Sequence, residues 1–439
     1  MELYVHIPFC VRKCGYCDFL SFAADEAVQR DYIDALRAEL KALDQVRSCK
    51  KACADAPSAH DANHAAFTTC FIGGGTPSIV PVSLMERLLD GIAALGVSGE
   101  YTIECNPGTL DESKLKIYKK YGINRLSIGL QSADDRELKR LGRIHDFDEF
   151  LNSYRMARAC GFDNINIDLM SGLPGQSTES FERTLRSAAE LEPEHLSVYS
   201  LIIEENTPFY ELYGGEGGDK AVKADHECEG RPSCAKSEET NAQLPDEDTE
   251  REMYRMTASV LEEYGFSRYE ISNYAKAGFE CRHNLGYWTG EEYEGAGIGA
   301  ASYLKTQTGI KTGQGGKSEI CALRYRNTTD INTYVHAFAE SASSARDAVR
   351  TVEEELAADD MIQEYIILHL RLIKGILRTD FTERFGFDIY EGYGRIIDKY
   401  LRSGHMETNG GYLRLTRRGL DVSNSIMADF MCEPISGCK

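Results

Sequence analysis

Six short strand-like runs alternate with helical patterns between residue 3 and about residue 205, and this alternation constrains the fold more than any other feature. The runs are rich in β-branched and aromatic residues, and the segments between them are amphipathic at helical spacing. A strand–helix–strand order repeated in this way favours a parallel sheet with crossover helices. We therefore predict an α/β fold, and six units resemble a partial (β/α)6 TIM-like barrel at least as well as an open doubly wound sheet. The predicted strands are Leu3–Ile7, Thr69–Ile72, Tyr101–Glu104, Arg125–Gly129, Ile165–Met170 and His195–Ile203.

Composition divides the chain into four segments. Residues 1–213 hold the predicted core barrel, with an inserted loop at 48–66. Residues 214–250 are polar, Gly-rich and charged, which is typical of a flexible insertion. Residues 251–310 contain the stretch HNLGYW and are expected to complete the barrel. Residues 330–439 show helical patterns, and the stretch HMETNGGYLRLT then contains an Asn-Gly signal for a β-hairpin. This order predicts a small C-terminal helical, winged-helix-like domain.

Charge and hydropathy limit the partners and the compartment. The formal charge of −21 argues against nucleic acid as a partner, because phosphate binding needs concentrated Lys and Arg. No apolar run is long enough to span a bilayer, and the N-terminus lacks the pattern of a secretory signal. We therefore expect a cytoplasmic protein without a transmembrane segment, in which most of the 14 cysteines stay reduced.

Three cysteines, Cys10, Cys14 and Cys17, follow the first predicted strand in the spacing C-x3-C-x2-C. A structural zinc site normally uses four ligands, usually in two pairs from separate loops. Three thiolates on one loop instead suit a [4Fe–4S] cluster, in which they would leave one iron open. Zinc binding and simple core packing are the less favoured alternatives.

The stretch YVHIPFCVRKCGYCDF resembles the radical S-adenosylmethionine (SAM) superfamily. Within it, the stretch is most similar to the group that contains oxygen-independent coproporphyrinogen III oxidase and the heme chaperone HemW family. The resemblance implies a radical SAM barrel with a [4Fe–4S] cluster whose open iron chelates the amino and carboxylate groups of SAM. It also implies that a reduced cluster can cleave SAM to a 5′-deoxyadenosyl radical, which is chemistry that the cofactors supply.

Polar motifs follow the predicted strands at their C-terminal ends, where barrels build active sites. GGGTP follows the second strand, and glycine there permits close backbone approach to a ligand. By resemblance to the family motif, Gly74, Gly75 and Thr76 are expected to contact the SAM amino group. Glu104 and Asp168, which end the third and fifth strands, are expected to accept hydrogen bonds from the ribose hydroxyls.

The resemblance assigns four further residues to the SAM site. Arg143 in LGRIHD is expected to pair with the SAM carboxylate through its planar guanidinium. Gln131 ends the fourth strand. Tyr4 and Tyr16 match the remaining SAM neighbours of the family.

Two features separate the oxidase from the chaperone. The oxidase usually extends its motif to C-x3-C-x2-C-x-C, whereas this chain has Phe19 at the last position. The stretch RHNLGYW matches the H-N-x-x-Y-W signature of the HemW family, so His283 is the candidate axial ligand of heme, with Tyr287 and Trp288 beside the macrocycle. The alternative is a hydrogen-bonded histidine next to two core aromatics.

The resemblance therefore implies a heme chaperone that binds heme and transfers it to an acceptor hemoprotein that remains unknown. It would carry the cluster and an exchangeable SAM, and an electron donor such as a flavodoxin or ferredoxin would be a further partner. The alternative is an oxygen-independent coproporphyrinogen III oxidase, which decarboxylates coproporphyrinogen III to protoporphyrinogen IX. Whether the chain is an enzyme stays open at this point, and a radical SAM enzyme acting on an unrelated substrate is the third hypothesis.

Overall fold

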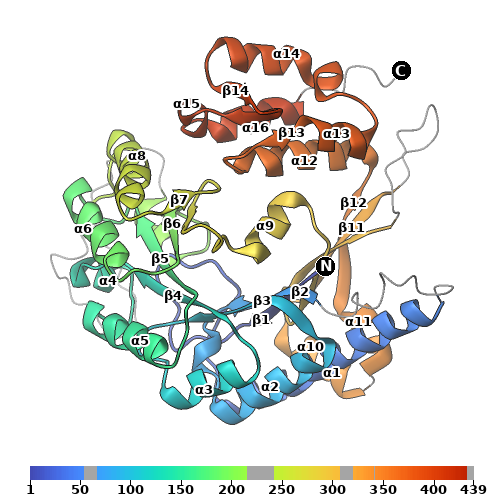
Figure 1. The fold of residues 1–439 in the computed structure, drawn as a ribbon. Coiled ribbons are helices and arrows are strands. Elements are labelled where there is room, and N and C mark those ends of the chain that lie inside the picture. Colours follow the sequence, from blue (N-terminus) through green and yellow to red (C-terminus); the bar gives the residue numbers. More distant parts are fainter. Residues whose placement is uncertain (54–66, 215–241, 307–319, 341, 433–439) are drawn as a thin grey trace.

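The computed structural model describes residues 1–53, 67–214, 242–306, 320–340 and 342–432, and it contains a twelve-stranded sheet at its centre (Figure 1). Six consecutive strands of this sheet are parallel, and each pairs with the next one along the chain. This confirms the predicted partial barrel. The six strands are β1 (Glu2–Ile7), β2 (Phe67–Gly74), β3 (Val97–Cys105), β4 (Arg125–Gln131), β5 (Ile165–Ser171) and β6 (His195–Ser200).

Helices connect the parallel strands and line the outside of the sheet (Figure 1). Local sequence sets where several of them begin: Asp146 and Glu149 form a reciprocal capping box at the start of α5, and the Asp111 side chain caps α3. The helices up to the end of the barrel are α1 (Glu26–Cys53), α2 (Val82–Leu95), α3 (Glu112–Lys120), α4 (Asp135–Arg140), α5 (Phe147–Ala159), α6 (Thr178–Ala189), α7 (Pro208–Tyr213) and α8 (Glu247–Glu263).

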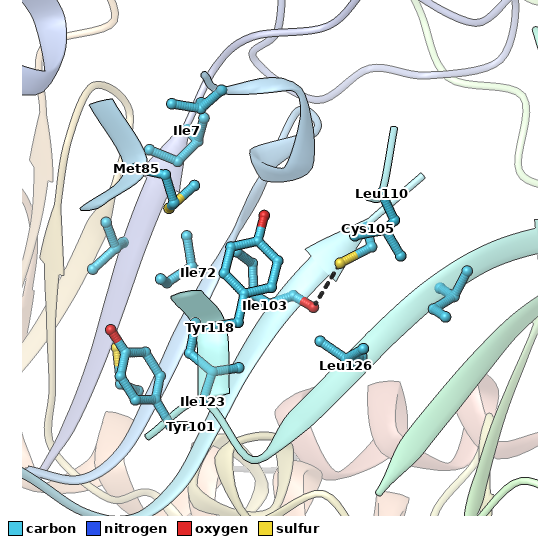
Figure 2. Close-up of a cluster of buried hydrophobic side chains, with 14 of the residues drawn as sticks. Ile7, Ile72, Met85, Tyr101, Ile103, Cys105, Leu110, Tyr118, Ile123 and Leu126 are labelled. Atoms are coloured by element: carbon cyan, nitrogen blue, oxygen red, sulfur yellow. Dashed lines mark hydrogen bonds between the residues drawn. The ribbon is translucent and has the colours of Figure 1, made fainter. Parts of the chain in front are cut away.

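Residues along each parallel strand alternate between an apolar outer face and a polar inner face. In β4, Leu126, Ile128 and Leu130 are fully buried in the hydrophobic core, whereas Ser127 lines an internal cavity. Figure 2 shows part of this core, in which side chains of β1, β2, β3 and β4 pack together with Met85 of α2 and Tyr118 of α3. Because neighbouring side chains of a strand point to opposite faces, the packing that holds the helices on the outside also directs the polar residues inward.

The segment expected to complete the barrel extends both edges of the parallel sheet. Beyond β6 lie the antiparallel strands β8 (Asn273–Ala275) and β7 (Ser267–Arg268). At the other edge, β9 (Tyr293–Ala296) is parallel to β1 and leads into an antiparallel series. That series is β10 (Ala301–Lys305), β11 (Ala322–Asn327) and β12 (Arg350–Leu356). Helix α9 (Arg282–Thr289), which carries HNLGYW, lies between the two edge segments in sequence.

The C-terminal unit has its own hydrophobic core and a three-stranded sheet of order β13-β15-β14. The turn between β14 and β15 contains Gly410 and Gly411, both with positive φ, as the Asn-Gly signal predicted. The small helix-and-hairpin unit is therefore confirmed. Its elements are α12 (Ala358–Arg371), β13 (Ile376–Leu377), α13 (Arg378–Phe385), α14 (Ile389–Arg402), β14 (Met406–Asn409), β15 (Tyr412–Leu415), α15 (Arg417–Leu420) and α16 (Ser423–Cys432).

The division between the two cores falls later than the predicted residue 330. Helices α10 (Ile331–Glu340) and α11 (Ala342–Val349) pack on α1, and Tyr334 and Phe338 belong to the core of the barrel unit. Strand β12 also pairs within the large sheet. The amphipathic pattern of these helices does not reveal which unit they cover, and the second core begins only with α12.

The two predicted insertions lie largely outside the described residues. Residues 48–53 continue α1, and 54–66 lie outside. Of the second insertion, 215–241 lie outside, and α8 already begins at Glu247. In the part of the chain that the structure describes, no helix combines the length and apolar character needed to cross a membrane.

Glu39 of α1 joins three distant parts of the first unit through its buried carboxylate. It accepts hydrogen bonds from the Gly297 backbone N–H and the Asn327 amide, both at 2.8 Å, and from the Tyr334 hydroxyl at 2.5 Å. Burial raises the pKa of Glu39, although these three donors favour the ionised form. The contacts fix α1 against the loop after β9, the end of β11 and α10.

Replacing Glu39 by Ala is expected to lower the free energy of unfolding by about 3 kcal/mol or more, because three buried donors lose their acceptor together. Urea denaturation followed by far-UV circular dichroism measures the change. Glu112→Ala on the exposed side of α3 is the control and should leave the midpoint unchanged. Equal midpoints for the wild type and Glu39→Ala would contradict the role of this carboxylate.

Candidate functional site

The loop after β1 brings the three cysteine thiols to the C-terminal end of the barrel. The Cys10 Sγ lies 3.5 Å from the Thr76 hydroxyl, and the Arg143 guanidinium donates to the Cys14 Sγ at 3.8 Å. Burial raises the pKa of the Cys17 thiol, and the nearby Cys14 and Cys10 raise it further. Cys14 and Cys10 therefore lie close enough to affect the Cys17 thiol.

The three thiols of this loop are not grouped around a single ion position. Within the described ranges, no three or more His, Cys, Asp or Glu side chains are arranged to hold one ion. A [4Fe–4S] cluster binds each thiolate at a different iron, so its ligands are spread apart. Cys10, Cys14 and Cys17 all line one cavity of about 400 Å³.

The GGGTP loop after β2 is bonded to the backbone that leads into the cysteine loop. The Gly75 N–H donates to the Ile7 carbonyl at 2.8 Å, and the Thr76 N–H donates to the Phe9 carbonyl at 2.7 Å. A Cβ added at Gly75 would lie 2.7 Å from the Phe9 carbonyl oxygen, and Gly74 has a φ of +112°. These glycines are required by the chain's own close packing as well as by any ligand.

Two carboxylates, Glu104 of β3 and Asp168 of β5, line the cavity. The Glu104 Oε2 accepts from the Gly74 N–H at 3.0 Å, and burial followed by the charge of Asp168 raises the pKa of Glu104 to about 8. Asp168 accepts from Ser127 at 3.0 Å and from Asn166 at 2.8 Å, while burial raises its pKa. Both acids are therefore positioned to accept hydroxyl hydrogen bonds from a ligand.

Arg143 is held at the cavity by neighbours that the sequence did not single out. Its guanidinium donates to the Asn106 side-chain oxygen at 2.8 Å and to the Gly129 carbonyl at 2.9 Å, and the Asn106 amide donates to Thr76 at 3.0 Å. Asn106 therefore links Arg143 to the GGGTP loop. Its position two residues after Glu104 in ECNPG was the only available signal.

Gln131 and Tyr16 also line the cavity that contains the three cysteines. Gln131 has a φ of +72°, an uncommon conformation for a residue other than glycine, and the pairing of β4 with β5 shifts register between Gly129 and Gln131. Tyr16 packs against Phe209 with 6.3 Å between ring centroids, and burial raises its pKa.

The 400 Å³ cavity therefore brings together all the predicted cluster and SAM residues except Tyr4. Tyr4 lies deeper in the barrel, where its hydroxyl forms a 3.0 Å hydrogen bond with the Nδ1 of His6. The predicted residues along the cavity are Cys10, Cys14, Tyr16, Cys17, Gly74, Gly75, Thr76, Glu104, Gln131, Arg143 and Asp168.

His283 lies near the opposite end of the parallel strands and does not line the cysteine cavity. It is 2% exposed, and its ring stacks on Phe71 at 5.2 Å. Its Nδ1 forms a 2.8 Å hydrogen bond with the Thr69 hydroxyl, and its Nε2 forms a 3.1 Å hydrogen bond with the Tyr287 hydroxyl. Burial lowers the pKa of His283 to about 3, so the imidazole is neutral. Ligation of heme iron through Nε2 therefore requires release of the Tyr287 hydroxyl.

Helix α9 is hydrogen-bonded to Glu100 of the barrel and packs closely on Glu2, two acidic residues that the sequence did not single out. Glu100 of β3 accepts from the backbone N–H groups of Arg282 at 3.0 Å and His283 at 3.1 Å. Glu2 of β1 lies so close to Gly286 that any Cβ there would overlap its carboxylate. The alternating pattern of the strands, with acidic residues on the inward positions, was the sequence signal for both.

The two aromatic residues of HNLGYW contact different parts of the protein. Tyr287 packs edge-on against Tyr293 of β9 at 4.7 Å between ring centroids. The Arg371 guanidinium of α12 lies 4.4 Å from the centroid of the Trp288 ring. The helix therefore touches both the barrel and the C-terminal unit.

Residues 4–188 match the Radical SAM superfamily, and residues 356–422 match the HemN C-terminal domain. A solved structure described as coproporphyrinogen III oxidase (HemN) from Escherichia coli, a radical SAM enzyme, superposes with a TM-score of 0.72 at 20% identity, over 98% of this chain and 89% of that one. The family match thus defines a radical SAM protein, and the superposition agrees with its fold.

Two curated relatives share the full length of the chain. The heme chaperone HemW of Bacillus subtilis strain 168 is 31% identical, over 98% of this chain and 99% of its own length. The heme chaperone HemW of Escherichia coli K12 is 33% identical, over 99% and 98%. The chain belongs to the HemW family.

The raised pKa of Glu104 predicts a pH dependence of stability in the cofactor-free protein. The unfolded chain releases this proton near 4.5, whereas the folded chain retains it up to about pH 8, so the stability that the proton confers is lost as the pH rises between these values. Glu104→Gln does not titrate. The wild type therefore loses stability relative to Glu104→Gln as the pH rises. The free energy of unfolding of Glu104→Gln minus that of the wild type is expected to increase by up to about 1.4 kcal/mol per pH unit between pH 5 and 8.

Urea denaturation of both proteins at a series of pH values checks this expectation. Glu112→Gln, at an exposed position with a lowered pKa, is the matched control and should show a constant difference from wild type over the same range. A pH-independent difference for Glu104→Gln would show that the folded protein ionises this acid normally.

Proposed function

We propose that this protein is a heme chaperone, which binds heme and transfers it to an acceptor hemoprotein. The observation that carries the proposal is the similarity to curated heme chaperones along the whole chain, including the segment with RHNLGYW. Heme is the proposed ligand, and His283 is the proposed axial ligand. The identity of the acceptor, the electron donor of the flavodoxin or ferredoxin type and the cytoplasmic location stay predictions from the sequence.

We also propose that Cys10, Cys14 and Cys17 hold a [4Fe–4S] cluster and that SAM occupies the adjoining cavity. When bound, this pair supplies one-electron chemistry to the site. The protein's own part is to bind and orient. Arg143 offers a guanidinium to a carboxylate, Glu104 and Asp168 offer acceptors to hydroxyl groups, and the GGGTP loop holds the cavity wall close to the cysteine loop.

The alternative function is that of an oxygen-independent coproporphyrinogen III oxidase. The structural similarity to that enzyme concerns the fold alone, because the identity is 20%. Phe19, which stands where the oxidase usually has a fourth cysteine, lines the cysteine cavity and is 63% exposed. An apolar side chain at that position favours the chaperone over the oxidase.

Heme titration of the anaerobically purified, cluster-reconstituted protein tests the main proposal through the Soret absorbance. The wild type is expected to bind one heme saturably, and His283→Ala to bind it about tenfold more weakly or with a changed spectrum, because the axial ligand is lost. Tyr287→Phe removes the hydroxyl that occupies the His283 Nε2, so its affinity should equal or exceed that of the wild type.

His336→Ala, at an exposed position of α10, is the matched control and should bind heme as the wild type does. Identical affinity and spectrum for His283→Ala and wild type would remove the ligand role of His283. Absence of specific heme binding in the wild type would overturn the chaperone proposal, and turnover of coproporphyrinogen III would then become the decisive assay.

The cluster assignment has a separate test. Cys17→Ala is expected to lose most of the iron, sulfide and visible absorbance of the reconstituted protein, because one of three thiolate ligands is missing. Cys160→Ala, which removes a thiol of similar partial burial at the end of α5, should retain them. Equal iron and sulfide content in both variants, or tight binding of one zinc ion in place of the cluster, would contradict the assignment.

A further inference from the structure

A second, smaller chamber lies inside the barrel, between the cysteine cavity and helix α9. Its volume is about 210 Å³. The two spaces share wall residues, including Glu104, Asp168 and Tyr199, so that they adjoin. Arg125 and His283 line only the smaller chamber.

Arg125 differs from the other residues of this chamber, because it is 2% exposed and its side chain forms no hydrogen bond or ion pair with any described residue. Its Nε is buried without a hydrogen-bond partner, and across the described residues no hydrogen bond or ion pair engages the rest of its guanidinium. By contrast, the buried Arg346 pairs with Glu294. Buried polar groups are nearly always hydrogen-bonded, so a whole guanidinium without a partner beside a cavity is a candidate site for a bound group.

The guanidinium remains charged in this position. Burial disfavours the charged form, but nearby acidic groups, among them the Glu100 and Asp168 carboxylates, outweigh it and raise the pKa of Arg125. Glu100 is engaged elsewhere, since its oxygens accept from the backbone of α9. A buried positive charge without a direct partner costs free energy, and an anion that pairs with it would recover that cost.

The position of Arg125 in the sheet separates it from the acids of the cysteine cavity. Arg125 pairs with Thr102 in the register of β3 and β4, whereas Glu104 pairs with Ser127, two residues further along. Two residues of a strand span about 7 Å. A ligand that enters from the cysteine cavity therefore reaches the guanidinium beyond the level of Glu104.

The planar guanidinium matches the two oxygens of a carboxylate, and the chamber offers stacked Tyr4 and Phe71 rings for an organic body. A space of about 210 Å³ admits a small organic acid or one arm of a larger molecule. We propose that this chamber binds an organic carboxylate whose two oxygens pair with Arg125.

The carboxylate has two possible sources, a free small acid or a propionate arm of a tetrapyrrole. Only the second source rests on the proposed heme function.

The test uses propionate as the probe and the cluster-reconstituted full-length protein. Sodium propionate is expected to raise the melting temperature of the wild type saturably and by several degrees more than sodium chloride at equal concentration. Arg125→Met keeps the length of the side chain and removes the unpaired charge. Its melting temperature without propionate should be no lower than that of the wild type, and it should lose the propionate-specific shift.

Arg136→Met, at an exposed arginine beside Asp134, is the matched control and should retain the full shift. Three results would overturn the proposal. The first is an equal effect of chloride and propionate on the wild type, which requires no variant. The second is an unchanged propionate shift in Arg125→Met. The third is a melting temperature of Arg125→Met well below that of the wild type, which would assign Arg125 a structural role.

Titration of heme against heme dimethyl ester distinguishes the two sources. The dimethyl ester lacks the free carboxylates of heme. If a propionate arm occupies the chamber, the wild type should bind heme about tenfold more tightly than the dimethyl ester, and Arg125→Met should bind both equally. An equal preference in both proteins, together with the propionate shift, assigns the chamber to a free small acid. A wild type that binds no heme but shows the propionate shift would overturn the heme function while supporting the chamber.

Discussion

The two-residue alternation of side chains in six parallel strands is the constraint on which the rest of this structure depends. The outward residues are apolar and hold the surrounding helices, so the inward residues can be polar and line the two cavities. A shift of one strand by a single residue would exchange the two faces, placing carboxylates against the helices. The interiors of complete (β/α)8 barrels are usually filled by branched apolar side chains. The interior of this partial barrel instead contains two cavities with polar lining residues, which can bind polar ligands.

The barrel interior has two ends with different chemistry. At one end the thiols, Arg143 and the GGGTP loop line a cavity of about 400 Å³, where the Arg143 guanidinium can pair with a carboxylate group. At the other end α9 is bound by Glu100, and its His283 is neutral and hydrogen-bonded at both ring nitrogens. Arg125 lies between these ends as the one described arginine of the smaller chamber. The proposed heme ligand His283 and the three cysteines therefore lie at opposite ends of two adjoining cavities.

Sequence analysis predicted the six strands, the cysteine loop and the polar residues at the strand ends, because these features depend on short-range patterns. It did not find Asn106, Glu100 or Arg125, whose roles depend on partners brought from other strands by the sheet register. The division between the two cores lies later than residue 330 for a related reason, since α10 and α11 carry the same amphipathic pattern whichever core they cover. The double hydrogen bonding of His283 likewise depends on Thr69, which is far away in sequence.

Helix α9 has a consequence for how the two units of the protein communicate. Its first turn is bound to the barrel through Glu100, and its Trp288 lies under Arg371 of the C-terminal unit. The helix has eight residues, so both contacts lie within little more than two turns of each other. Any molecule that binds the barrel interior and prefers one position of α9 must therefore change the docking of α12 by the same free energy, and docking must change that binding equally in return.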